Sequence, residues 1–171
     1  MQTSSSLLPS GFADLLSPDA WRERRLRNTV LERFRNFGYE EVSPPLLEFE
    51  DSLLEKTKLN RQTFRVMDTK SQRMMGLRAD MTPQIARIAA SRMDNEALPL
   101  RLCYAGTCLR IKGDGLDKSR QVIQAGIECI GAKSDSSLIE ILRCAQETLS
   151  AIEVNDLSLD LTLPGLLTTL L

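Results

Sequence analysis

The residues whose types could do chemistry gather between Arg101 and Gly131, in the stretch RLCYAGTCLRIKGDGLDKSRQVIQAGIECIG. Two apolar runs flank a polar turn that contains glycine, and this pattern predicts a β-hairpin. The hairpin also carries charged and amide groups, on Arg110, Lys112, Lys118, Arg120, Gln124 and Glu128. Because such groups bind ligands through charge-assisted hydrogen bonds, we interpret the hairpin as a candidate binding surface.

The two-residue period of a strand divides the second half of this hairpin into two faces. Gln124, Gly126 and Glu128 share one face, where the glycine leaves space over the sheet for a ligand. The other face is predicted to be core, and it carries Ile123, Ala125, Ile127 and Cys129.

The partner strand and the preceding hairpin repeat this arrangement. Tyr104, Gly106, Cys108 and Arg110 share a face; Gly76, Arg78 and Asp80 alternate before Thr82. The predicted pocket has three glycines at its floor, Gly76, Gly106 and Gly126. Its walls are four polar residues, Asp80, Arg110, Gln124 and Glu128. Carboxylates would hold an ammonium group and an arginine a carboxylate or phosphate, so a small zwitterion suits this pocket.

Each of these residues also has a purely structural interpretation. Asp80 and Thr82 could only cap a helix, and Gln124 and Glu128 could face water on an open sheet. The cationic residues Arg110, Lys112, Lys118 and Arg120 could form a solvated turn. Spacing alone leaves both interpretations open.

Composition excludes several classes of site. The sequence contains no histidine, so histidine-based triads, general bases and metal ligands are excluded. The cysteines form no C-x-x-C pair and lie in apolar patterns, so we expect buried, reduced thiols at Cys103, Cys108, Cys129 and Cys144. We therefore expect no metal and no cofactor.

Charge and hydropathy limit the partners and the compartment. The 22 Lys and Arg residues nearly balance 23 Asp and Glu residues, giving a net charge of -1. We see no basic surface run, so neither nucleic acid nor an anionic membrane is expected as a partner. Neither a signal peptide nor a membrane span is indicated, and we expect a cytoplasmic protein.

The elements that position these residues follow from periodicity and turn signals. Residues 1–16 read as a tail and turn segment, and residues 17–171 as one partial domain. A helix is predicted from Ser17 as N-cap to Gly38, with Leu26, Val30, Phe34 and Phe37 on its buried stripe. A strand over residues 39–50 is broken by Pro44-Pro45.

The remaining chain alternates between strands and helices. We predict a hairpin from residues 63–68 and 73–80, a helix starting at Thr82-Pro83, and the hairpin over residues 99–131. Ser137 and Glu140 fit a capping box for a helix whose buried stripe contains Leu138, Ile141, Leu142, Ala145, Leu149 and Ile152. A strand over 157–163 and the start of a helix over 165–171 follow. This order predicts an α+β fold with an antiparallel sheet flanked by helices, incomplete at its C-terminus.

Four segments resemble the histidyl-tRNA synthetase family. GFADLLSP resembles its N-terminal signature, and FGYEEVSPPLLE resembles the first class II motif, with Pro45 at the dimer-interface proline and Glu48 after it. LRADMTPQIAR lies where synthetases have Leu-Arg-Pro-Glu-Gly-Thr, so Asp80 replaces the glutamate that holds the histidine ammonium and Thr82 matches the threonine. The hairpin resembles the second class II motif.

The resemblance implies roles for the hairpin residues. Arg110 matches the arginine that contacts phosphate and the amino-acid carboxylate, and Gln124 and Glu128 match histidine-binding positions. The implied histidine site is Asp80, Thr82, Arg110, Gln124 and Glu128, and the implied phosphate or anion site is Arg110, Lys112 and Arg120. The implied class II fold has an antiparallel sheet flanked by helices.

Departures from the synthetase pattern favour a non-catalytic relative. Lys112 stands where synthetases carry the glutamate that helps recognise the adenosine. A carboxylate that accepts hydrogen bonds is therefore replaced by an ammonium group that only donates them. The chain is more similar here to the regulatory subunit of ATP phosphoribosyltransferase. That resemblance implies no catalytic residue, a short-form catalytic subunit as partner, self-association as a dimer, and histidine as feedback effector. A synthetase fragment and a dimerisation module with a vestigial pocket remain alternatives.

Overall fold

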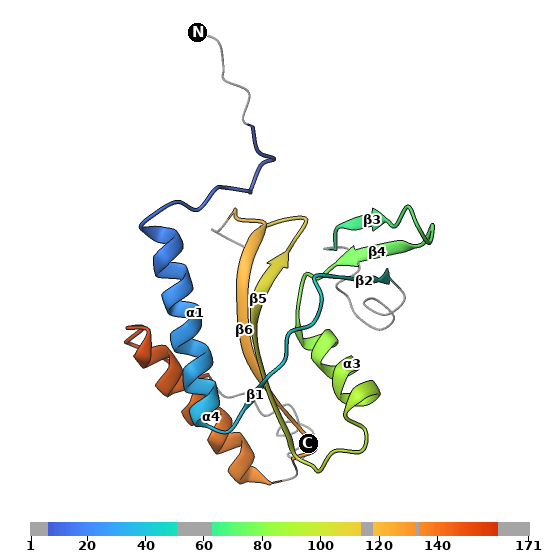
Figure 1. Cartoon of the computed structure of the whole chain (residues 1–171). Coiled ribbons are helices and arrows are strands. Elements are labelled where there is room, and N and C mark those ends of the chain that lie inside the picture. Colours follow the sequence, from blue (N-terminus) through green and yellow to red (C-terminus); the bar gives the residue numbers. More distant parts are fainter. Residues whose placement is uncertain (1–6, 51–62, 114–117, 133, 161–171) are drawn as a thin grey trace, which may run out of the picture.

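A computed structural model describes residues 7–50, 63–113, 118–132 and 134–160 (Figure 1). The elements in chain order are α1 (Asp19–Asn36), β1 (Glu40–Glu41), β2 (Leu47–Phe49), β3 (Arg65–Met67), β4 (Met74–Leu77), α3 (Thr82–Arg92), β5 (Leu100–Leu109), β6 (Gln121–Ile130) and α4 (Asp135–Ala151). The expected α+β class is confirmed. Both predicted hairpins are present, as β3–β4 and β5–β6.

The described strands form two sheets, ordered β1-β5-β6 and β2-β4-β3. All pairs are antiparallel except β1–β5, which is parallel. Pro44-Pro45 separates β1 from β2 and sends them to different sheets, because proline has no N–H to donate to a ladder. The expected pocket floor is therefore wrong in one respect, since Gly76 lies in β4 and the other two glycines in the β5–β6 sheet.

Strand β5 is buried on both faces and lies between the helices (Figure 1). Strand β6 is only half-buried, and the predicted core face is wrong at Ile123 and Ala125, which are exposed. On one face, Met81 and Ile85 pack against Leu102 and Tyr104 beside α3. On the other face, residues of α1 and α4 surround Cys103 in a second cluster. This two-sided packing explains why β5 is apolar along most of its length.

The starts of three helices differ from the prediction. No side chain caps α1, whose first turn closes by a hydrogen bond from the Ala20 amide to the Leu16 carbonyl, so the Ser17 cap is wrong. No side chain caps α4 either, and the predicted capping box is wrong because Glu140 binds Arg101 instead. Before α3, Asp80 Oδ1 accepts a 2.9 Å hydrogen bond from the Thr82 amide, so Asp80 takes the capping role expected of Thr82.

The buried face of α4 is also displaced from the predicted stripe. Cys144 and Thr148 are buried, whereas Leu138 and Ala145 are exposed. The other residues of the predicted stripe, Ile141, Leu142, Leu149 and Ile152, are half-buried, and Ile152 packs against the cluster that contains Cys144. In α1 the predicted Val30 and Phe34 are buried as expected, and Phe37 is half-buried. The predicted stripe is wrong at Leu26, which is 39% exposed.

The two ends of the described chain are irregular. Residues 157–160 form no strand; the rest of the strand predicted over 157–163 and the helix predicted over 165–171 lie outside the described residues. Among the described helices, none combines the length and apolarity needed to cross a membrane.

Candidate functional site

Four of the predicted histidine-site residues meet in one hydrogen-bond network on the α3 side of the β5–β6 sheet. Gln124 Nε2 donates to Asp80 Oδ1 at 2.9 Å, and Gln124 Oε1 accepts from the Met81 amide at 2.8 Å. The Tyr104 hydroxyl donates to Glu128 Oε1 at 3.3 Å and lies 3.1 Å from the Thr82 hydroxyl. The structure thus brings together Asp80, Thr82, Gln124 and Glu128, from strand β6 and the start of α3.

The space above the hairpin glycines is filled by the chain itself, which corrects the expected open floor. A Cβ at Gly126 would lie 2.5 Å from the Tyr104 hydroxyl, because Tyr104 is the cross-strand partner of Gly126. A Cβ at Gly106 would lie 2.6 Å from Arg78 Nη2 and 3.1 Å from Met81 Sδ. The glycines therefore admit Tyr104 and Arg78, and any ligand must contact these side chains.

Tyr104 is the main site residue to which the sequence pattern gave no role. Burial, together with the negative charges of Glu128 and Asp80, raises its pKa to about 12, although the hydrogen bond with Thr82 opposes this shift. The phenol is therefore protonated at neutral pH and acts as a donor. The hairpin register, counted from the turn, is the signal that could have placed Tyr104 over Gly126.

Cys108 lies beside the network and fixes the orientation of Gln124. Its thiol donates to Gln124 Oε1 at 3.2 Å. Burial raises the pKa of this thiol to about 11, so it stays protonated and donates. With two donors on Oε1, the amide of Gln124 must point Nε2 at Asp80, which makes Gln124 a positioning residue for that carboxylate.

The cationic residues of the hairpin differ in their surroundings. The Arg120 guanidinium donates to the Ser10 carbonyl at 3.1 Å and to the Arg110 carbonyl at 3.3 Å, and it lies 4.6 Å from the ring centre of Phe64. Arg120 thus connects the N-terminal segment, the hairpin and Phe64. An anion would have to compete with these contacts to bind the Arg120 guanidinium. Lys112 is exposed, and Arg110 is half-buried at the base of the turn.

Arg78 holds the β2 and β5 segments together beneath the site. Its Nε donates to the Thr107 carbonyl at 2.7 Å and its Nη1 to the Pro44 carbonyl at 2.8 Å. The side chain is buried, so these bonds are needed to offset the loss of hydration. Arg78 therefore joins the two sheets rather than contacting solvent.

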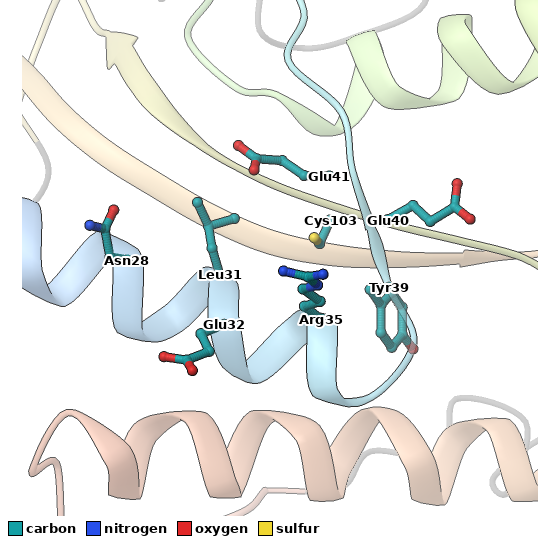
Figure 2. A pocket seen from close by; sticks show the side chains of 8 residues that line it. All are labelled: Asn28, Leu31, Glu32, Arg35, Tyr39, Glu40, Glu41 and Cys103. Atoms are coloured by element: carbon teal, nitrogen blue, oxygen red, sulfur yellow. The ribbon is translucent and has the colours of Figure 1, made fainter.

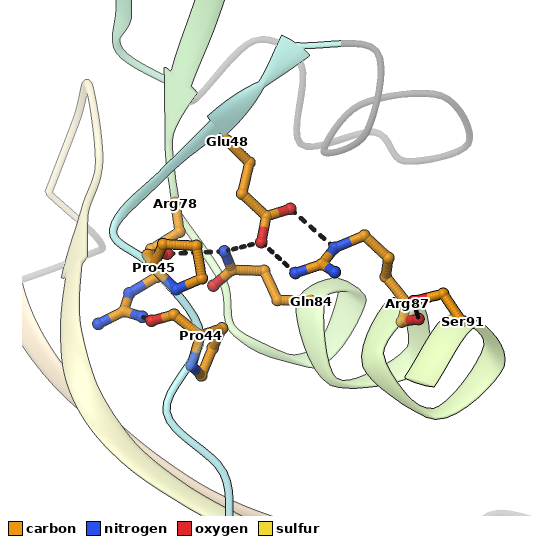
Figure 3. Close-up of polar contacts among 7 residues, drawn as sticks. All are labelled: Pro44, Pro45, Glu48, Arg78, Gln84, Arg87 and Ser91. Atoms are coloured by element: carbon orange, nitrogen blue, oxygen red, sulfur yellow. Dashed lines mark hydrogen bonds and ion pairs between the residues drawn. The ribbon is translucent and has the colours of Figure 1, made fainter. Parts of the chain in front are cut away.

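The Pro45 region carries a second polar cluster (Figure 3). Gln84 Nε2 donates to the Pro45 carbonyl at 2.9 Å and to Glu48 Oε1 at 2.8 Å, and Arg87 binds both carboxylate oxygens of Glu48. Pro45 itself is exposed, whereas Pro44 is buried. The cluster fixes the segment before β2 on α3, and it leaves the proline face open to solvent.

A pocket of about 640 Å³ lies on the other face of the sheet (Figure 2). It is lined by Asn28, Leu31, Glu32, Arg35, Tyr39, Glu40, Glu41 and Cys103. Because Cys103 and Tyr104 alternate along β5, this pocket is separated by the sheet from the Asp80 network. Burial raises the pKa of the Cys103 thiol to about 11, which leaves it a poor nucleophile.

The cysteines all lie within the described part of the chain. Cys103, Cys108 and Cys144 are buried and Cys129 is half-buried, and all four are free thiols. Over the described ranges, no three histidine, cysteine or acidic side chains are grouped so that they could hold a metal ion.

Comparison with known proteins places this geometry in a family. The family model described as Histidyl-tRNA synthetase matches residues 11–171. The chain belongs to this family. Within the histidyl-tRNA synthetase family, solved structures with the same fold include an ATP phosphoribosyltransferase regulatory subunit/histidyl-tRNA synthetase from Bacillus halodurans, with a TM-score of 0.79 and 25% identity over 91% of this chain and 40% of that one. This likeness confirms the expected class II synthetase-like fold.

Curated relatives of this chain carry another name. A 50% identical protein from Paramagnetospirillum magneticum and a 47% identical protein from Rhodospirillum centenum are both named ATP phosphoribosyltransferase regulatory subunit. The matches cover 94% and 97% of this chain but 43% and 44% of the relatives. The chain therefore spans less than half the length of these proteins.

Proposed function

We propose that this chain is part of a non-catalytic regulatory subunit of ATP phosphoribosyltransferase that senses histidine for feedback control of histidine biosynthesis. The observation that carries the proposal is the convergence of Asp80, Thr82, Gln124 and Glu128 on one hydrogen-bond network. The names of the relatives support the assignment to this complex.

The network has the chemistry to hold histidine. Both hydrogen bonds of the Asp80 carboxylate to described residues use Oδ1, so Oδ2 can accept from the ammonium group of a ligand. Glu128, oriented by the Tyr104 hydroxyl, can accept from an imidazole N–H. Arg110, at the base of the same hairpin, supplies positive charge for the ligand carboxylate. A cation at one end and an anion at the other match a zwitterion.

The proposed mechanism is allosteric and uses no acid, base or nucleophile of this chain. Histidine would bind more tightly when the short-form catalytic subunit is in its inhibited arrangement, and a coupling free energy of about 1–3 kcal/mol is typical of such control. The protonated Tyr104 and Cys108 are suited to fixing geometry, since neither loses its proton near neutral pH.

Co-purification of the full-length protein tests this function. The full-length chain should form a complex with the short-form catalytic subunit of the same organism and restore its ATP phosphoribosyltransferase activity. Histidine should then inhibit the complex. A catalytic subunit that gains no activity from the full-length chain would contradict the proposal.

A histidyl-tRNA synthetase remains the second candidate, favoured by the family model that matches residues 11–171. Lys112 argues against it, because an exposed ammonium group cannot accept the hydrogen bond that the synthetase glutamate makes. Histidine-dependent exchange between ATP and pyrophosphate separates the two functions. A third possibility, a dimerisation module with a vestigial pocket, predicts that the full-length chain does not bind histidine.

A further inference from the structure

Helix α1 concentrates positive charge in a chain that is nearly neutral. It contains six arginines, Arg22, Arg24, Arg25, Arg27, Arg33 and Arg35, against Asp19, Glu23 and Glu32. Since the whole chain has a net charge of -1, the remainder is net negative. The arginines are interrupted by acidic and apolar residues in sequence, and α1 carries three more basic than acidic side chains.

One stripe of this helix combines positive charge with an exposed aromatic ring. Pro18, Trp21, Arg22 and Arg25 follow the i, i+3, i+4, i+7 spacing of one helix face and line a hollow of about 470 Å³. Trp21 is 66% exposed. The buried Val30 marks the face of α1 that packs on the hairpin, so the stripe points away from the sheet.

Exposed apolar side chains extend this surface toward the N-terminus. Leu15 and Leu16 directly precede the helix and are 49% and 74% exposed. The Leu16 carbonyl accepts a hydrogen bond from the Ala20 amide, which ties the leucine to the first turn of α1 beside Trp21. Three exposed apolar side chains, Leu15, Leu16 and Trp21, therefore lie within seven residues of one another at the start of α1.

We propose that Leu16, Trp21, Arg22 and Arg25 form a docking surface for a partner protein that presents acidic side chains around an apolar patch. Tryptophan and arginine are the residue types that most often dominate binding energy in protein interfaces. The Arg22 guanidinium donates to Asp19 at 2.7 Å, so part of the stripe is held in place before a partner arrives. This inference rests on the proposed function, in which the partner is the catalytic subunit of ATP phosphoribosyltransferase.

The dimensions of the stripe favour protein over nucleic acid. From Pro18 to Arg25 the helix rises only about 10 Å, so the stripe can reach few phosphates of a duplex. The negative charge on the rest of the chain would also repel a polyanion. A short cationic stripe beside apolar side chains instead matches the mixed character of a protein interface.

The position of the stripe favours a different protein over a second copy of this chain. Figure 1 shows α1 at one side of the molecule and the β2–β4–β3 sheet, which follows Pro45, at the other. If two copies associate through the Pro45 region, as the first class II motif implies, the stripe of each copy remains exposed. Docking at α1 is then compatible with a dimer.

Calorimetry with the full-length protein and the catalytic subunit tests the docking surface. Arg25→Glu and Trp21→Ala should each raise the Kd of the complex by roughly tenfold or more. Arg143→Glu makes the same charge change on an exposed site of α4 and serves as the matched control, with affinity unchanged. Arg25→Glu should also reduce the salt dependence of the Kd, whereas a merely structural loss would leave that dependence unchanged.

The outcomes separate this inference from the proposed function. A complex that both α1 variants form with unchanged affinity would overturn the docking surface and leave the function intact. Failure of the unmodified full-length protein to bind would overturn both. If Trp21→Ala abolishes self-association, the stripe binds a second copy of this chain. If the unmodified protein binds tRNA and Arg25→Glu abolishes that binding, the stripe binds nucleic acid. Either result overturns the proposal.

Discussion

At the scale of single residues, Tyr104 determines how the candidate site is built. Its ring occupies the space that Gly126 leaves, and its hydroxyl lies between Thr82 and Glu128. Glycines on a sheet face can accommodate a ligand or a neighbouring side chain, and sequence alone does not distinguish these. Here the cross-strand register places Tyr104 over Gly126, so a ligand on this face would contact the phenol ring rather than the glycine.

The first prediction concerns the two carboxylates of the site. In the full-length protein, Asp80→Ala and Glu128→Ala should each weaken histidine binding by roughly 1–3 kcal/mol, because each removes a charge-assisted hydrogen bond. Calorimetry should show this loss, while Glu147→Ala, on the exposed face of α4, should bind like the unmodified protein. Equal affinities in all three variants would rule out the assigned pocket.

The second prediction concerns alkaline pH. Because folding raises the pKa of Tyr104 from 10.0 to about 12, its protonated form stabilises the fold below about pH 10, and this contribution is lost as the pH rises toward 12. The raised thiol pKa values of Cys103 and Cys108 act in the same direction from about pH 9. Urea unfolding from pH 8 to 11 should show falling stability, and Tyr104→Phe should make the fall shallower above pH 10. An unchanged slope in Tyr104→Phe would contradict the assignment.

At the scale of elements, Arg120 connects segments that are far apart in sequence. Its amide donates to the Gly11 carbonyl at 2.8 Å, and its guanidinium lies against both Phe12 and Phe64. The guanidinium also donates to carbonyls of the N-terminal segment and of the hairpin. The segment around Gly11, predicted as a tail, therefore contacts the hairpin next to Arg110. We call this set of contacts around Arg120 the brace.

The third prediction tests this brace with two glycines of the same backbone conformation. Gly11 and Gly38 have φ angles of 83° and 81°, so an alanine at either position costs roughly 1–2 kcal/mol. At Gly11 the new Cβ would also lie 2.6 Å from the Arg120 side chain, whereas at Gly38 nothing lies within 4 Å. Urea unfolding of the full-length protein should show a larger loss for Gly11→Ala than for Gly38→Ala. Equal losses would mean that Arg120 moves aside freely.

The elements themselves were largely predictable, and their contacts were not. Periodicity and turn residues located the helix and strand regions because these signals act over a few neighbouring residues. The division into two sheets depends on how β1 and β2 pair with distant strands, which no local pattern specifies. Glu140 illustrates the same limit: its capping position is a local inference, but Arg101, 39 residues away, binds its carboxylate at 2.9 Å.

At the scale of the whole molecule, the small sheet presents an apolar surface near Pro45. Leu47 and Val66 share one face of this sheet and are 38% and 45% exposed. The fourth prediction is that full-length protein forms a dimer through this region, as the first class II motif implies. Sedimentation should show that Leu47→Asp lowers the dimer fraction, while Val154→Asp, at a residue that is 41% exposed beyond α4, does not. A monomer at micromolar concentration would contradict the prediction.

The fifth prediction concerns adenylate formation by the full-length protein. The full-length chain should not support histidine-dependent exchange between ATP and pyrophosphate, because adenylate formation requires specific recognition of adenosine as well as binding of phosphate. Lys112 can only donate hydrogen bonds, and together with Arg110 it adds positive charge that favours an anion over a neutral base edge. Phosphate or pyrophosphate binding at the turn is compatible with this charge.

The contrast between Lys112→Glu and the unmodified chain makes this prediction specific. Restoring the carboxylate alone should not create exchange activity, because Asp80 and the following Met81 also differ from the synthetase Pro-Glu-Gly pattern, and Met81 is buried against Gly106 in the core of the site. Radiolabelled pyrophosphate exchange with the full-length protein measures both variants, with a histidyl-tRNA synthetase as positive control. Robust exchange by the unmodified chain would establish the synthetase function, and exchange gained by Lys112→Glu would show that a single charge separates a histidine sensor from an adenylating enzyme.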